Sequence, residues 1–409
     1  MELFPREKYL ERMRSFYDAD DLIKVITGIR RCGKSCLMQT IAAELRSRGV
    51  KEENIIFIDL DKRGYGNIRR PEQLETIIEG KTHVDGLKYV FIDEIQNVDG
   101  FENVINGFRN EGNYSIFITG SNSYLLSGEL VTKLTGRYIE FELYPLTLDE
   151  FIEMKQFYGK SLPSDRQDLL NQYILEGGFP RSIFFDELFD KHTYVQSIIT
   201  EIFAKDIKKR IKIRDKDAFE RVQNYIINNF AATTSIVNLC NAMKQSGITV
   251  SRPTVTRYIQ VLVDAKILIA CDRFDMKSKK SLSGEKKYYL SDLSFYYAMN
   301  TDSRINYGPV LENIVCLYAK SMNYKLSIGR IGKLECDFIL RNTNMEYSYI
   351  QVAYTILSSR DTEDREYRSL EAIKDNYAKY VMTMDGLIQK RNGIIHVNIL
   401  DFMRKRMKF

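Results

Sequence analysis

Short apolar segments alternate with amphipathic segments over the first 150 residues of the chain. Continuous apolar runs are typical of buried strands, and apolar residues spaced three and four apart are typical of helices. Buried strands separated by helices predict a parallel sheet with helices on both faces. The candidate strands are 22–27, 55–59, 89–93, 116–119 and 138–143, and the helices between them include Pro71–Glu79 and Phe101–Arg109.

The pattern becomes helical between residues 144 and 194. It is interrupted by Glu176-Gly177-Gly178-Phe179-Pro180, because glycine and proline break helices. We interpret the whole segment as a helical lid. The glycine pair is then a candidate hinge between this lid and the next part of the chain.

A third pattern runs from about residue 215 to 292. It predicts three amphipathic helices and then two strands joined by a loop rich in lysine, serine and glycine, which is the winged-helix arrangement. The helices are 219–230, 235–244 and one that starts after Ser251, and the strands are 267–270 and 287–290. The third helix would expose Arg252, Thr254, Thr256 and Arg257, residue types that contact phosphates and base edges. Docking of a protein is the alternative role.

After residue 300 the chain alternates strands and helices again. The predicted helices are 310–322 and 364–377, and the predicted strands are 335–340, 347–352, 380–384 and 394–399. The fold class that follows for the whole chain is α/β with several domains.

The segment V-I-T-G-I-R-R-C-G-K-S joins the first strand to the first helix after it, and it contains the pattern G-x-x-x-x-G-K-[ST] of a phosphate-binding loop. Glycines let backbone N–H groups turn toward phosphates, Lys34 can contact the β- and γ-phosphates, and the Ser35 hydroxyl can hold Mg²⁺. The expected nucleotide contacts are Gly28, Ile29, Arg30, Arg31, Cys32, Gly33, Lys34, Ser35 and Cys36.

A second motif, Y-V-F-I-D-E, ends the third strand in two carboxylates. We expect Asp93 to position Mg²⁺ through water and Glu94 to act as the general base toward the attacking water. The sequence lacks the Asn-Lys-x-Asp element that reads guanine. ATP is therefore the predicted nucleotide.

Two further positions are candidates for catalysis. Ser121 or Asn122, directly after the fourth strand, could sense the γ-phosphate, and a polar loop cap is the alternative. Arg137, just before the fifth strand, could reach the nucleotide of a neighbouring subunit, as an arginine finger does. That role would require a homo-oligomer, and an ordinary surface arginine in a turn is the alternative.

The composition limits the class of protein. A chain of 409 residues is too long for one core, and 44% hydrophobic with 28% charged residues is typical of soluble globular proteins. The sequence has neither a membrane-length apolar stretch nor an apolar secretory segment at its start, so we expect a cytoplasmic protein without a membrane partner. Six cysteines without a C-x-x-C pair and three widely separated histidines predict free thiols and no histidine-based metal site.

The net charge of +5 is small, but positive residues gather at 205–214 and 277–287. Lys208, Lys209 and Arg210 in the first cluster are candidate contacts to double-stranded DNA. A solvated face is the alternative.

The motifs G-I-R-R-C-G-K-S, F-I-D-E-I-Q, T-G-S-N-S, L-T-G-R-Y and E-G-G-F-P resemble a family of uncharacterised prokaryotic AAA+ ATPases over nearly the whole chain. In that family a conserved C-terminal region of unknown function follows the ATPase core. The resemblance implies Lys34 and Ser35 as the Walker A pair and Asp93 with Glu94 as Walker B. It divides the chain into a P-loop AAA+ core (1–145), a helical lid and connector (146–200), a winged-helix domain (201–300) and an α/β domain similar to restriction endonucleases (301–409).

Nucleases similar to this last domain hold Mg²⁺ on an acidic residue of the first helix, an aspartate and a Glu-x-Lys element. Here Glu312, Asp337 and Gln351-Val352-Ala353 take those places. An alanine cannot replace the lysine that helps to activate water. We therefore expect a degenerate nuclease fold that can still bind DNA, and an unrelated α/β domain stays open.

Three functions remain in view. The first is an ATPase that uses ATP and Mg²⁺ and couples hydrolysis to DNA-binding modules. The second is a nucleotide-gated signalling or scaffold ATPase that binds a protein partner. The third, disfavoured by Ala353, is an ATP-dependent nuclease.

Overall fold

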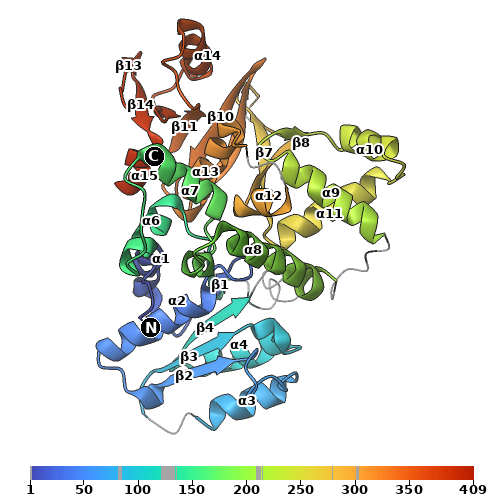
Figure 1. Cartoon of the computed structure of the whole chain (residues 1–409). Coiled ribbons are helices and arrows are strands. Elements are labelled where there is room, and N and C mark those ends of the chain that lie inside the picture. Colours follow the sequence, from blue (N-terminus) through green and yellow to red (C-terminus); the bar gives the residue numbers. More distant parts are fainter. Residues whose placement is uncertain are drawn as a thin grey trace. The chain divides into compact units, whose positions relative to one another are not determined.

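The computed structural model describes residues 2–81, 85–120, 134, 136–208, 213, 215–278, 280–300 and 304–409, with the backbone alone for 280–285. The chain forms two compact units, Met1–Tyr144 and Pro145–Phe409, and each is described separately (Figure 1). In the described residues, no helix has the length and apolar character needed to cross a bilayer.

The first unit is built on a five-stranded parallel sheet in the order β2-β3-β4-β1-β5. Its elements are α1 (Glu7–Met13), β1 (Ile23–Thr27), α2 (Lys34–Ser47), β2 (Ile55–Asp59), α3 (Pro71–Glu79), β3 (Lys88–Asp93), α4 (Phe101–Glu111), β4 (Tyr114–Gly120) and β5 (Tyr138–Glu142). The predicted parallel sheet is confirmed, with strand bounds within two residues of the expected ones.

Side chains of each strand alternate between the two faces of this sheet. On one face, Val90 and Ile92 of β3 pack in a core with Leu74 of α3 and Ile105 of α4. On the other face, Phe91 stacks on Phe117 with ring centroids 4.7 Å apart. Both faces are therefore buried, which explains why the strands read as continuous apolar runs.

The order of the strands places the motifs of the sequence together. β4 lies between β1 and β3, and all three strands run in the same direction. The phosphate-binding loop, the residues after β3 and the end of β4 therefore meet at the carboxyl edge of the sheet, where ligands of such sheets bind.

The second unit begins with helices and continues into a mixed nine-stranded sheet in the order β13-β14-β12-β11-β10-β9-β7-β8-β6. Its helices are α6 (Leu148–Phe157), α7 (Arg166–Glu176), α8 (Leu188–Ile202), α9 (Lys216–Asn228), α10 (Ile236–Gln245), α11 (Arg252–Asp264), α12 (Ser294–Met299), α13 (Tyr307–Ser321), α14 (Arg360–Glu371) and α15 (Ile399–Arg404). Its strands are β6 (Thr233–Thr234), β7 (Leu268–Asp275), β8 (Lys280–Leu290), β9 (Lys325–Ile331), β10 (Leu334–Arg341), β11 (Tyr347–Val352), β12 (Ala378–Thr383), β13 (Lys390–Arg391) and β14 (Ile394–Asn398).

The hairpin of β7 and β8 differs from the sequence-based expectation. Its strands are longer and extend into the segment expected to be a loop, and β6 adds to β8 as a short third strand. β7 also pairs in parallel with β9, with Arg273 opposite Ile328. The hairpin is thus part of the same sheet as β10 to β14, and β9 is a strand that we did not predict.

The glycine pair after α7 is held on several sides. The Gly178 N–H donates to Asp292 Oδ2 at 2.8 Å, and its carbonyl accepts from the Leu146 N–H at 2.7 Å. A Cβ on Gly177, whose φ is +73°, would come within 2.2 Å of Asp292 Oδ1. These contacts fix the pair between two other segments, which disagrees with the hinge that its sequence indicates.

Candidate nucleotide site

The phosphate-binding loop leaves β1 at Thr27 and enters α2 at Lys34. Gly28 has φ +145°, and a Cβ there would lie 2.1 Å from the carbonyl oxygen of Leu143. Gly33 caps α2 with φ +107°. Both positions therefore require glycine, as the motif predicts.

Arg6 is a residue of this loop region that sequence reasoning missed. Its buried guanidinium donates from Nη1 to the carbonyl oxygens of Cys32, at 3.2 Å, and of Tyr144, at 2.7 Å. The Cys32 thiol donates to the Leu143 carbonyl at 3.4 Å. These bonds hold the loop against the end of β5. Arg6 precedes the motif by more than twenty residues, so spacing gave no signal for it.

Lys34 is 4% exposed, and its ammonium donates to the carbonyls of Gly28, at 3.0 Å, and Ile29, at 3.3 Å. The side chain of Lys34 thus folds back over the loop that precedes it. Of the other predicted contacts, Ile29, Arg30 and Cys32 are buried, Gly33 and Ser35 are half-buried, and Arg31 and Cys36 are exposed.

The two Walker B residues are joined through Thr119, at the end of β4. The Thr119 hydroxyl donates to Asp93 Oδ1 and accepts from the Glu94 N–H at 3.0 Å. Thr119 and Asp93 are buried, with 0% and 3% exposure. Sequence reasoning placed the polar link two or three residues later, at Ser121 or Asn122, which lie outside the described residues.

Glu94 has a left-handed backbone, with φ 56° and ψ 47°, and starts a short turn over Ile95–Asn97. Burial raises the pKa of its carboxyl, while the charges of Lys34 and Arg30 lower it and Asp93 raises it. Positive φ is uncommon for a residue with a side chain, and such positions gather at functional sites.

These residues fit a nucleoside triphosphate with Mg²⁺. The cradle at Gly28 leaves no room for a Cβ, and a lysine amine lies inside the loop. In the described residues, no three acidic, histidine or cysteine side chains are grouped to hold a metal. Mg²⁺ at phosphates does not need such a group, because it keeps waters and takes only one or two protein oxygens.

Arg137 lies directly before β5, at the amino end of the strand. Its Nη1 donates to Asn106 Oδ1 at 3.2 Å, and its carbonyl accepts from the Ile23 N–H at 2.9 Å. Because β5 runs parallel to β1, Arg137 lies at the edge of the sheet opposite the phosphate-binding loop.

On α11 the predicted contact residues differ in exposure. Arg252, Thr256 and Arg257 are exposed, whereas Thr254 is half-buried and its hydroxyl bonds the Ser251 hydroxyl at 2.8 Å. Lys208 is exposed, and Lys209 and Arg210 lie outside the described residues.

The C-terminal carboxylates form a cluster around Lys287 of β8. Its ammonium contacts Glu312 Oε2 of α13 at 3.1 Å and Glu335 Oε1 of β10 at 2.8 Å. The Tyr289 hydroxyl also donates to Glu312, at 3.0 Å. Burial lowers the pKa of Lys287, but the charges of Glu312, Asp337 and Glu335 outweigh it and raise the pKa overall.

Asp337 and Gln351 have different neighbours. Asp337 Oδ2 accepts from the Val352 N–H at 2.8 Å, and burial together with Glu312 raises the pKa of Asp337 well above its ordinary value. Gln351 donates to Glu366 at 3.1 Å and accepts from the Ser369 hydroxyl at 3.0 Å. The amide of Gln351 is thus bonded to α14. From the sequence, Lys287 was assigned to the basic cluster 277–287; its burial among these carboxylates was missed, because it lies in a different predicted domain.

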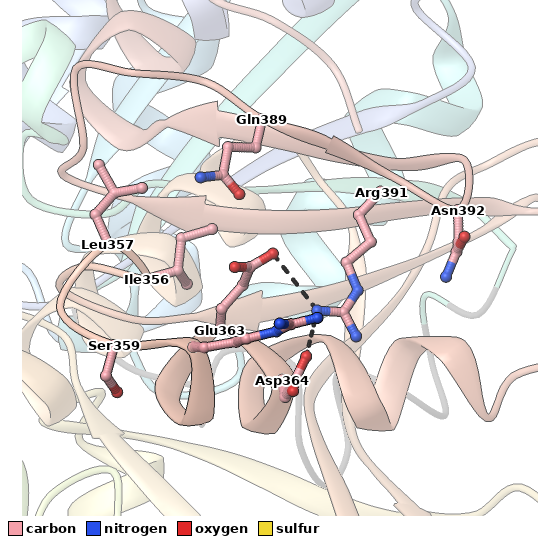
Figure 2. A pocket seen from close by; sticks show the side chains of 9 residues that line it. Ile356, Leu357, Ser359, Glu363, Asp364, Gln389, Arg391 and Asn392 are labelled. Carbon is pink, nitrogen blue, oxygen red and sulfur yellow. Dashed lines mark hydrogen bonds and ion pairs between the residues drawn. The ribbon is translucent and has the colours of Figure 1, made fainter.

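A cavity of about 670 Å³ lies beside the start of α14 (Figure 2). Arg391 reaches across it and contacts Asp364 at 2.6 Å and Glu363 at 3.4 Å. The lining residues are Ile356, Leu357, Ser359, Arg360, Glu363, Asp364, Gln389, Arg391 and Asn392. None of the site residues predicted from the sequence is in this lining, and the acidic partners of Arg391 offset its charge.

Two domain models match parts of this chain. The model of an AAA domain matches residues 20–152, and a domain of unknown function (DUF8612) matches residues 167–305. An uncharacterized protein of Haemophilus influenzae is 32% identical over 403 residues, which is 98% of each chain. The uncharacterized protein MJ1544 of Methanocaldococcus jannaschii is 30% identical over 386 residues, 92% of this chain and 84% of that protein.

Among solved structures, a Walker-type ATPase of Pyrococcus abyssi is similar to this chain, with a TM-score of 0.51 and 14% identity. The match covers 73% of this chain and 96% of that one. At such low identity the likeness concerns the fold.

Proposed function

We propose that this chain, which carries an AAA domain and belongs to the same family as the uncharacterized proteins of Haemophilus influenzae and Methanocaldococcus jannaschii, hydrolyses ATP with Mg²⁺. One observation carries the proposal. Lys34, Asp93 and Glu94 meet at the carboxyl edge of one parallel sheet, and Thr119 of the strand between them links the Asp93 carboxylate to the backbone N–H of Glu94.

Each side chain has a distinct task in this proposal. Lys34 binds the β- and γ-phosphates, and Ser35 with Asp93 holds Mg²⁺, which when bound offsets the charge of the phosphates. Glu94 takes a proton from the water that attacks the γ-phosphorus, and the bond to the β-phosphate oxygen breaks. Ser121 or Asn122 remains the proposed sensor of the γ-phosphate.

Arg137 is proposed to act on a neighbouring subunit. β5 separates it from the nucleotide edge by five residues, or about 16 Å of strand at about 3.3 Å per residue. An arginine at the opposite edge is too far from its own chain's phosphates. In a homo-oligomer, the Arg137→Ala variant should bind ATP normally and hydrolyse it at least about tenfold more slowly. Unchanged turnover of the Arg137→Ala variant at high protein concentration would contradict a role of Arg137 as an arginine finger.

We also propose that the ATPase is coupled to double-stranded DNA through residues 201–300 and 301–409, with 146–200 as the lid and connector between them and the core (1–145). Arg252, Thr256 and Arg257 support this, because three exposed side chains of one helix can contact phosphates or base edges together. Binding of a protein partner instead of DNA is the second candidate, and the mixed charge around Lys286 and Asp272 favours neither.

The test is ATP hydrolysis with and without double-stranded DNA over a range of protein and Mg²⁺ concentrations. We expect Mg²⁺-dependent turnover that rises with DNA and with protein concentration. Turnover that ignores DNA would favour the protein-binding alternative, and absence of turnover in all conditions would refute the ATPase. Mg²⁺-dependent DNA cleavage that is lost in Asp337→Ala would restore the nuclease.

A further inference from the structure

The side chain of Gln96, in the turn after β3, is bonded to the proposed general base. Gln96 Nε2 donates to Glu94 Oε2. In the described part of the chain, Gln96 Oε1 is buried and has no hydrogen-bond partner. The amide is therefore held by Glu94 alone. A flipped amide would set its oxygen against the carboxylate, so the neighbour fixes which end is the donor.

A buried carbonyl without a partner is costly, and a folded protein rarely keeps one without a compensating role. For Gln96, the compensating contact is the bond to Glu94. The rest of the turn does not require this side chain, because Asn97 holds the turn to the preceding loop through Asp61 Oδ1 at 3.0 Å.

Glu94 is held at two points. Thr119 fixes its backbone N–H, and Gln96 fixes one carboxylate oxygen. In the described residues no donor bonds the other oxygen, Oε1. The positive charges of Lys34 and Arg30 both lower the pKa of this carboxyl. Glu94 is therefore close enough to the phosphate-binding loop to interact with two of its charged residues. One oxygen is thus anchored and the other is available to a water.

We propose that Gln96 is a positioning residue of the ATPase: by holding Oε2 of Glu94, it directs Oε1 toward the attacking water. This inference rests on the proposed function and adds a residue to it. Anchoring of a base by a neutral donor keeps its rotamer fixed without neutralising it, and a misplaced base loses rate rather than substrate affinity.

The experiment measures kcat for ATP hydrolysis and the Kd for ATP in Gln96→Ala and Gln96→Glu. We expect kcat to fall about tenfold in Gln96→Ala, equivalent to about 1.4 kcal/mol, with the Kd for ATP within about twofold of the unaltered protein. Gln96→Glu keeps the size of the side chain but replaces the donor, so it should lose at least as much. A role in packing alone predicts that Gln96→Glu stays active.

Asn97→Ala is the matched control in the same turn. It removes the bond to Asp61 but leaves the bond to Glu94, so we expect a smaller loss of kcat than in Gln96→Ala. In the Glu94→Gln background, Gln96→Ala should cause no further loss, because its target is gone. A kcat for Gln96→Ala equal to or above that of the unaltered protein, equal losses in kcat and ATP affinity, or full additivity with Glu94→Gln would each overturn the inference. Unaltered protein that does not hydrolyse ATP would overturn the proposed function itself, so the two failures are distinguishable.

Discussion

Each unit of this protein combines carboxylates with a buried lysine, but the lysines differ in what they bond. In the first unit, the Lys34 ammonium lies on two backbone carbonyls, 3.0 and 3.3 Å away, and leaves Asp93 and Glu94 to Thr119 and Gln96. In the second unit, Lys287 contacts Glu312 and Glu335 directly. The first arrangement keeps a cation and two carboxylates separate and ready for a ligand. The second neutralises them against one another.

This difference teaches that the position of the cation decides what a carboxylate cluster can do. A lysine held by neutral carbonyls can exchange them for phosphate oxygens at little cost. A lysine paired within a buried carboxylate cluster is expensive to remove, because an unpaired charge then remains. We therefore expect chemistry at Asp93 and Glu94 and structural support at Lys287.

The largest expected effect tests the first half of the comparison. Glu94→Gln removes the proposed base but keeps its size, so kcat should fall by about 10²- to 10⁴-fold, while ATP binding is retained. Steady-state hydrolysis and ATP titration measure the two quantities. Asp337→Asn, the matched change in the second cluster, should leave kcat unchanged. Normal turnover in Glu94→Gln would contradict the assignment of chemistry to the first unit.

The second prediction concerns the ion pairs of the second cluster. Lys287→Met leaves Glu312 without its cation, whereas Glu335 keeps Arg273 at 3.2 Å. The free energy of unfolding of the Pro145–Phe409 unit should therefore fall by about 3 kcal/mol. Urea denaturation of the full chain measures it.

The neighbouring Lys286 provides the control for this change. Its partner is Asp272, and the two side chains are 41% and 58% exposed. Lys286→Met should therefore cost less than about 1 kcal/mol. Equal losses in the two variants would contradict the structural role of Lys287, and addition of Glu312→Gln to Lys287→Met should recover part of the stability.

The first site was predictable from sequence because its residues occur in two continuous motifs, and strand order alone brings the ends of β1 and β3 to one edge. Thr119 and Gln96 lie inside or beside those motifs, yet their hydrogen bonds depend on rotamers that no spacing encodes. Arg6 reaches the loop only because the chain before β1 folds back against it, and no motif in the sequence indicates that fold.

The second cluster was less predictable, because its parts come from distant segments. Glu312 and Asp337 were found by resemblance, whereas Lys287 reaches them through a hairpin that joins the large sheet by the pairing of β7 with β9. Long-range pairing of this kind leaves no local pattern. The missed strand β9 has a different cause: it pairs with the adjacent β10, but its alternation is irregular and the register of the pair is broken by a bulge in β10.

A third prediction uses a buried carboxylate of the second unit that has no lysine partner among the described residues. Asp292 is bonded by the N–H groups of Gly178 and Ser294, and burial raises its pKa from an ordinary 3.8 to about 6. The folded state then binds the proton more tightly than the unfolded state. Stability from this group is full below pH 4 and is lost as the pH rises through about 6, by about 3 kcal/mol at most.

The measurement for Asp292 is the free energy of unfolding between pH 4 and pH 7, in the unaltered protein and in Asp292→Asn. The difference between the two should change with pH in this window, because asparagine does not titrate. A constant difference would mean that Asp292 stays ionised without a cation, and that N–H donors can do for a carboxylate what Lys287 does for Glu312.

The smallest expected effect concerns the function of the second unit, whose carboxylate cluster is paired with Lys287. The proposal is binding, through exposed arginines of α11. Arg252→Ala together with Arg257→Ala should weaken binding of double-stranded DNA by about tenfold and reduce the slope of log affinity against log salt by about 2, one for each lost phosphate contact. Lys216→Ala with Arg221→Ala removes the same charge from the exposed face of α9 and serves as control. If both pairs weaken binding equally, the contribution is net charge alone. A loss specific to α11 would mean that the second unit binds DNA while the first unit carries out the chemistry.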